Sequence, residues 1–174
     1  MLNRPLEVID EFPFFSFLLG DLHPHVLAIP FGLLAIAAAL NLFLGGWRGE
    51  VKLPLGARLR ISASGFLFMA LLLGGLAFLN TWDILIAAAL IVASYVLWRA
   101  NEAGWRWARL EDALLFGLPL GILAILMYLP FYVGFSSQAG GVLPNFMYPT
   151  RGIHLWVMWG TLLIPILAYV VYLW

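Results

Sequence analysis

The sequence contains no cysteine and very little charge. Without cysteine the chain has no disulfide, thiolate nucleophile or cysteine metal site, so its chemistry must come from carboxylates, histidines, arginines and amides. Charged residues make up 10% of the 174 residues, and the nine Lys and Arg residues balance the nine Asp and Glu residues. Because there is no basic excess, no nucleic-acid partner is expected.

Apolar residues dominate instead, at 64% of the chain, which is outside the range of soluble domains. A membrane-spanning helix needs about 20 apolar residues. Five stretches come close, and all are continuously apolar rather than alternating, which is typical of helices. We therefore predict an all-α, polytopic integral protein of the cell membrane, a single transmembrane region over 1–174. Its about five transmembrane helices are expected at 26–44, 61–79, 82–98, 113–133 and 155–174.

Four glycines lie inside these stretches, at Gly74, Gly75, Gly117 and Gly121. Small residues let membrane helices approach one another closely. We interpret these glycines as packing positions rather than as parts of a site.

Basic residues concentrate in two alternate connections, 45–60 and 99–112, which hold seven of the nine Lys and Arg residues. The positive-inside rule places such loops in the cytoplasm. The N-terminal segment, the "NTWD" turn and the connection 134–154 then face outward, and they contain all three histidines. We predict a functional site on this extracytoplasmic face.

The outward stretch "DEFPFFSFLLGDLHPH", residues 10–25, sets three carboxylates and two histidines beside apolar sequence. Its apolar middle predicts a short interfacial helix after Pro13. Pro24 disfavours a helix around the histidines, so we predict a surface turn with both imidazoles on one side. Carboxylates and imidazoles could hold a divalent cation. The candidate metal ligands are Asp21, His23 and His25. An ordinary surface loop without a metal ion would show the same spacing.

Three further outward residues are candidates for organising the site or binding a substrate phosphate: Asp83, Arg151 and His154. Arginine binds phosphate oxygens bidentately. Alternatively, Arg151 snorkels to lipid headgroups beside Trp156 and Trp159, and both interpretations stay open. The glycine-rich connection before Arg151 is interpreted as a mobile outer loop that could cover a substrate.

Several motifs, in this order, carry a resemblance to a known family: "EFPFFSFLLGDLHPHVLAIPF", "FLNTWD", "SSQAGGVLPN" and "PTRGIHLWVMWG". They resemble the uncharacterised bacterial and archaeal polytopic proteins of the YYY membrane protein family. That family is similar to the C-type glycosyltransferases, which use polyprenyl-phosphate sugars outside the membrane. The order of "DE" and "DLHP" also resembles protein O-mannosyltransferases of that superfamily. The resemblance implies that Asp10 or Glu11 is the catalytic base, and that Asp21 and His23 organise the site or a metal ion.

The resemblance implies a glycosyltransferase whose partners are membrane lipid and a lipid-linked sugar donor. Related proteins carry more spans, including one before the acidic pair, so we predict a fragment that packs with the remaining helices of a longer chain. Two alternatives remain: a transporter or flippase-like protein, and a structural subunit without catalysis. A transporter would be expected to carry ionisable groups at the membrane midplane and repeated halves, and the sequence shows neither.

Overall fold

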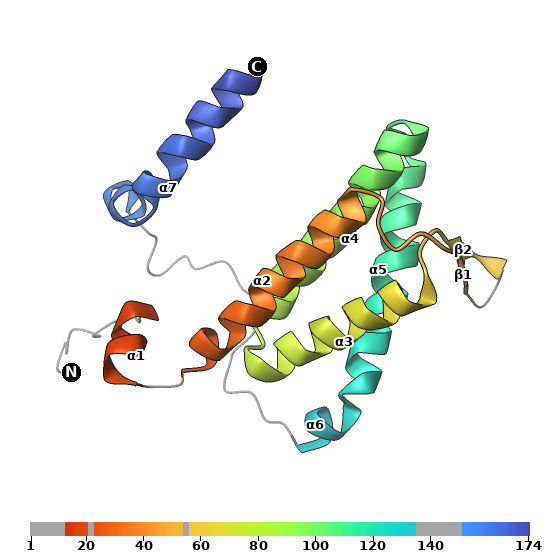
Figure 1. Cartoon of the computed structure of the whole chain (residues 1–174), viewed down its shortest axis with the longest axis horizontal. Coiled ribbons are helices and arrows are strands. Elements are labelled where there is room, and N and C mark those ends of the chain that lie inside the picture. Colours follow the sequence, from red (N-terminus) through yellow and green to blue (C-terminus); the bar gives the residue numbers. More distant parts are fainter. Residues whose placement is uncertain (1–12, 21–22, 54–55, 135–150) are drawn as a thin grey trace, which may run out of the picture. The chain divides into compact units, whose positions relative to one another are not determined.

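The computed structural model describes residues 13–20, 23–53, 56–134 and 151–174, which form two compact units, Met1–Ser136 and Ser137–Trp174. Helices dominate both units, in agreement with the prediction (Figure 1). The first unit contains α1 (Pro13–Leu19), α2 (Pro24–Phe43), β1 (Val51–Lys52), β2 (Arg58–Leu59), α3 (Ala63–Leu79), α4 (Asp83–Ala103), α5 (Ala108–Met127) and α6 (Leu129–Gly134). The second unit contains α7 (Gly152–Leu173).

Three helices in the described part of the chain are long and apolar enough to cross a membrane, namely α2, α4 and α5. The helix α3 has 17 residues, and the apolar part of α7 covers Trp159–Leu173. Each of the five predicted stretches contains a helix. By length and composition, however, three spans are supported rather than five.

The predicted span 113–133 differs from the structure at both ends. The helix α5 begins five residues earlier, at Ala108, and ends at Met127, before the separate short helix α6. Pro130 follows this break, and a proline has no N–H to donate to the carbonyl one turn earlier. The apolar run therefore contains two helices instead of one.

The core of the first unit lies where α2 packs along α4, and where α3 and α4 pack against α5. At its centre, the ring of Tyr95 on α4 stacks on Phe116 of α5, with centroids 4.3 Å apart. The edge of Phe66, from α3, approaches the same Phe116 ring at 5.9 Å. Aromatic pairs of this kind add to the stabilisation from burial alone, so they fix α3, α4 and α5 together.

The helices α3 and α5 approach each other closely at Gly74. A Cβ atom there would lie 2.8 Å from the carbonyl oxygen of Ala124 and collide with the ring of Tyr128. Tyr128 Oη in turn donates a hydrogen bond to the carbonyl of Leu71, at 3.2 Å. The interpretation of Gly74 as a packing position is confirmed, because only a residue without a side chain leaves room for this contact.

The other three glycines differ in how much room a side chain would have. A Cβ on Gly75 would lie 3.2 Å from Tyr128 Oη, and one on Gly117 would lie 3.2 Å from Val92, so these two are packing positions as predicted. Within the described residues, a Cβ on Gly121 would meet nothing within 4 Å. The packing interpretation therefore stays a prediction at Gly121.

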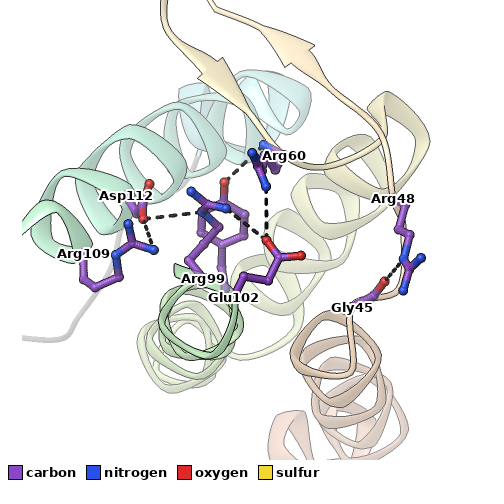
Figure 2. A network of polar contacts seen from close by, with 8 residues as sticks. Gly45, Arg48, Arg60, Arg99, Glu102, Arg109 and Asp112 are labelled. Carbon is purple, nitrogen blue, oxygen red and sulfur yellow. Dashed lines mark hydrogen bonds and ion pairs between the residues drawn. The ribbon is translucent and has the colours of Figure 1, made fainter. Parts of the chain in front are cut away.

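The helix α2 ends in a turn that two backbone hydrogen bonds close. Gly45 has φ of +79° and donates its N–H to the carbonyl of Leu42, while Gly46 donates to Asn41. This pair of bonds is the Schellman motif, which favours glycine because of the left-handed backbone. Arg48 Nε donates to the carbonyl of Gly45 at 3.2 Å (Figure 2), which holds the chain as it leaves the helix.

A small antiparallel hairpin follows this turn, in a segment that the sequence identifies only as a basic loop. Val51 pairs with Leu59, and Lys52 pairs with Arg58. Leu59 and Ile61 are buried, and the backbone N–H of Arg60 between them donates to Tyr95 Oη at 3.2 Å. The hairpin is thus an addition to the all-α prediction, and it anchors Arg60 over the end of α4.

Candidate functional site

The predicted outer site is described in part, around the two histidines that precede and begin α2. Pro24 is the first residue of this helix, and the carbonyl of His23 accepts from the N–H groups of Val26 and Leu27 at 2.9 and 3.1 Å. The prediction of a non-helical turn is therefore wrong at His25. Proline is well tolerated at a first helical position, where its missing N–H would have no helical partner.

The imidazole rings of His23 and His25 lie side by side, with centroids 5.0 Å apart and planes at 46°. The prediction that both point to one side is confirmed. Two imidazoles at this distance can act on one substrate group or donate to one anion. The pair is the part of the predicted site that the structure brings together.

The predicted helix after Pro13 is also present, as α1. Its side chains at Phe14, Phe17 and Leu18 are about two-thirds or more exposed, whereas Ser16 is buried. A short helix with large apolar side chains toward the surroundings is typical of an interfacial segment. The position of α1 at the interface stays a prediction.

Asp83 begins α4 after the predicted "NTWD" turn. Its N–H donates to the carbonyl of Asn80 at 3.0 Å. Its partly buried side chain lines a groove of about 210 Å³ with Gly32 and Ala35 of α2. Gly32 lies seven residues beyond His25, or about 10 Å along the helix axis. Asp83 is thus placed further along the bundle than the histidine pair and not in contact with it.

The remaining predicted site residues are described only in part. Asp10, Glu11, Asp21 and the predicted covering loop over 135–150 lie outside the described residues. In the second unit, Arg151 caps the N-terminus of α7 and is exposed. His154 lies in the first turn of α7, but its side chain is outside the described part.

Metal binding stays a prediction. Among the side chains of 13–20, 23–53, 56–134 and 151–174 that are described, no group of three histidines and carboxylates could hold an ion. The predicted ligand set of His23, His25 and Asp21 includes a residue outside these ranges, so that set is untested.

A second polar site lies at the opposite end of α4, where arginines and carboxylates alternate (Figure 2). Arg60 Nη1 and Arg99 Nη1 contact Glu102 Oε2 at 3.3 and 3.1 Å. Asp112 Oδ2 lies 3.6 Å from Arg99 Nε and 3.1 Å from Arg109 Nη1. We call these five residues the ion-pair cluster; it joins the hairpin, α4 and α5.

The inner half of the ion-pair cluster is shielded from water. The side chains of Arg99, Arg109 and Asp112 are 14%, 9% and 21% exposed, against 64% for Arg60. Shielded ion pairs interact more strongly than exposed ones, and losing one partner leaves an uncompensated charge. The cluster therefore links α4 to α5 most firmly through Asp112.

A comparison with protein families agrees with the apolar helices of both units. The model of an uncharacterised membrane protein family, DUF2298, matches residues 6–174. This chain belongs to that family. The predictions of an uncharacterised membrane protein family and of a membrane location are confirmed at this level. Comparisons of the DUF2298 chain with curated proteins and with solved structures gave no match.

The sequence analysis of this DUF2298 protein missed the ion-pair cluster. It counted the basic residues of 45–60 and 99–112 for orientation and did not assign them partners. Two pairs with helical spacing, Arg99 with Glu102 and Arg109 with Asp112, were the available signal, because residues three apart on a helix are neighbours. The contact of Arg60 with Glu102 spans 42 residues and has no such local signal.

Proposed function

We propose that this DUF2298 chain acts as, or within, a membrane glycosyltransferase with a C-type fold. It transfers a sugar from a polyprenyl-phosphate donor to an acceptor hydroxyl at the extracytoplasmic face. The observation that supports this most is the close pair of imidazoles at His23 and His25. They follow directly on Asp21 in the "DLHPH" motif that carries the resemblance.

The proposed reaction needs a base and a group that stabilises the leaving phosphate. Asp10 or Glu11 takes the proton of the acceptor hydroxyl, whose oxygen then bonds to the anomeric carbon of the sugar. The bond from that carbon to the phosphate oxygen breaks, and the electron pair leaves with polyprenyl phosphate. The imidazole pair, Arg151 or a divalent cation stabilises this charge, a contribution worth several kcal/mol in known enzymes.

The proposal includes five membrane spans, with α3 and α7 added to the three long helices. With 17 residues, α3 is about 26 Å long, somewhat short of the ~30 Å hydrocarbon layer. A short helix is accommodated by local thinning of the bilayer, and α3 packs between α2, α4 and α5. Five spans place the hairpin in the cytoplasm and the histidine pair outside.

This topology can be tested directly because the chain has no native cysteine. We expect a membrane-impermeant maleimide to label Thr81→Cys on intact cells, because Thr81 is exposed in the turn between α3 and α4. Lys52→Cys and Ala103→Cys, exposed near the other end of the bundle, should react only after permeabilisation. Labelling of all three variants on intact cells would contradict the topology.

If the proposed function is correct, the rate of sugar transfer depends on the imidazole pair of His23 and His25. Replacing His23 by alanine is expected to lower the initial rate of sugar transfer about 100-fold, the usual size of one lost group that stabilises developing charge. The measurement uses proteoliposomes, a radiolabelled polyprenyl-phosphate sugar and a hydroxylated acceptor. Lys52→Gln, an exposed change at the opposite end, is the control with an unchanged rate.

Two results would count against this proposal. A His23→Ala rate equal to that of the control would remove the imidazole pair from the reaction. Movement of the labelled lipid across the bilayer without any sugar transfer would favour the flippase-like alternative.

A further inference from the structure

A pocket of about 440 Å³ opens beside the ion-pair cluster, between the end of α4 and the start of α5. It combines apolar side chains with two arginines and two tryptophans. The lining residues are Val96, Trp105, Arg106, Trp107, Arg109, Leu110 and Ala113. We call it the α4–α5 pocket; it lies at the opposite end of α4 from Asp83 and is separate from the proposed transfer site.

Arg109 gives the α4–α5 pocket a buried cation. The residue is 7% exposed, and its Nη1 lies 3.1 Å from Asp112 Oδ2. Neither Nε nor Nη1 makes a hydrogen bond of good geometry within the described residues. A buried guanidinium with unused donors is costly. An anion in the pocket that Arg109 lines would place negative charge beside this cation.

The surroundings of the pocket carry more positive than negative charge. Arg106 lines it and is exposed, and it adds to the three arginines of the ion-pair cluster. The two charged residues among its described lining residues are both arginines, Arg106 and Arg109. The pocket therefore favours an anionic ligand over a neutral or cationic one.

The walls favour a ligand that is also apolar. Val96, Leu110 and Ala113 form a surface along α4 and α5, both of which are long and apolar enough to cross a membrane. Trp105 and Trp107 are 73% and 87% exposed at the rim. Tryptophans of this kind are enriched at the level of lipid headgroups.

We propose that the α4–α5 pocket binds an anionic phospholipid of the surrounding membrane. The lipid phosphate is held by Arg106 and Arg109, since guanidinium groups pair well with phosphate oxygens. One acyl chain lies along Val96, Leu110 and Ala113. Basic pockets between membrane helices on the cytoplasmic side bind anionic headgroups in this way, which agrees with the orientation expected from the basic loops.

Native mass spectrometry of the purified chain in detergent tests this site, with phosphatidylglycerol and phosphatidylcholine as the lipids. We expect phosphatidylglycerol to bind about fivefold or more tightly than phosphatidylcholine, as one to two basic contacts would give. Arg106→Gln should lower phosphatidylglycerol affinity about fivefold. Lys52→Gln, which removes the same charge from the exposed hairpin, should leave it unchanged.

A second variant reduces the volume of the α4–α5 pocket without changing its charge. Ala113→Phe fills the pocket and leaves every arginine in place, so it should also reduce bound phosphatidylglycerol. Millimolar inorganic phosphate should not displace the lipid if the acyl chain contributes to binding.

Three outcomes would overturn the proposal. These are equal binding of the two lipids, an Arg106→Gln affinity equal to that of Lys52→Gln, and displacement of the lipid by free phosphate. Because Arg106 is exposed, its variant keeps the test decisive even if Ala113→Phe does not fold.

Discussion

Replacing Asp112 by asparagine is expected to destabilise the first unit by about 3 kcal/mol, as when one partner of a buried ion pair is removed. Asp112 Oδ2 is the only carboxylate oxygen in the described part of the chain with an ion pair to Arg109, at 3.1 Å, and it also contacts Arg99. Without it, Arg109 has no ion-pair partner within the described residues, while Arg99 keeps Glu102, 3.1 Å from its Nη1. Thermal unfolding in detergent measures the loss.

The matched control is Glu50→Gln, which likewise converts a carboxylate to an amide. Glu50, however, pairs with one arginine. Glu50 Oε1 lies 3.3 Å from Arg58 Nη1, but the two side chains are 46% and 66% exposed. Exposed pairs contribute about 0–1 kcal/mol, so this variant should melt close to the unmodified chain. An Asp112→Asn variant as stable as Glu50→Gln would contradict the importance assigned to the ion-pair cluster.

A double substitution distinguishes a lost ion pair from a lost side-chain shape. If the cost of Asp112→Asn comes from the uncompensated charge of Arg109, then Arg109→Met in the same chain should recover part of it. If the two costs simply add, Arg109 and Asp112 do not interact across this turn of α5. The cycle therefore measures the interaction between these two residues.

Much of the helical architecture could be predicted from the apolar runs. The runs at 26–44 and 82–98 overlap α2 and α4, because about 20 continuous apolar residues favour a helix in a membrane. The residues at which the helices end were less predictable. Arg99 to Ala103 are polar or small, yet they extend α4 because Arg99 and Glu102 are held by the ion-pair cluster.

The burial of the hairpin and the contact of Arg60 with Glu102 could not be predicted, because they depend on contacts between distant parts of the chain. Leu59 is an apolar residue inside a basic loop, and only the folded bundle shows that it is buried. Arg60 then meets Tyr95 and Glu102, more than 30 residues away. The positive-inside rule counts basic residues in each loop and predicts the orientation of the chain in the membrane, but it does not predict which residues these side chains contact.

The histidine pair was predictable in part. The two imidazoles lie close together as expected, but the extended turn from which this was predicted was wrong, because α2 begins at Pro24. A proline can be either a helix breaker or the first residue of a helix. The apolar run that begins two residues later, at Val26, favours the second outcome here.

The acidic pair before α1 is where we expect the largest effect on activity. Asp10→Asn or Glu11→Gln should lower the rate of sugar transfer by about 100- to 10,000-fold, the range for loss of a general base. Each variant keeps the size of the side chain and removes its ability to take a proton. Binding of the donor lipid should persist, because the base acts on the acceptor hydroxyl.

The most direct measurement of the proposed function is the transfer of radiolabelled sugar from polyprenyl phosphate to an acceptor hydroxyl in proteoliposomes. The unmodified chain, Asp10→Asn, Glu11→Gln and the Glu50→Gln control are compared at equal amounts of folded protein. We predict transfer by the unmodified chain and the control, and its near-complete loss in one of the two acidic-pair variants. Equal transfer in all four proteins would contradict the proposal, and no transfer by the unmodified chain would contradict its acting as the transferase on its own.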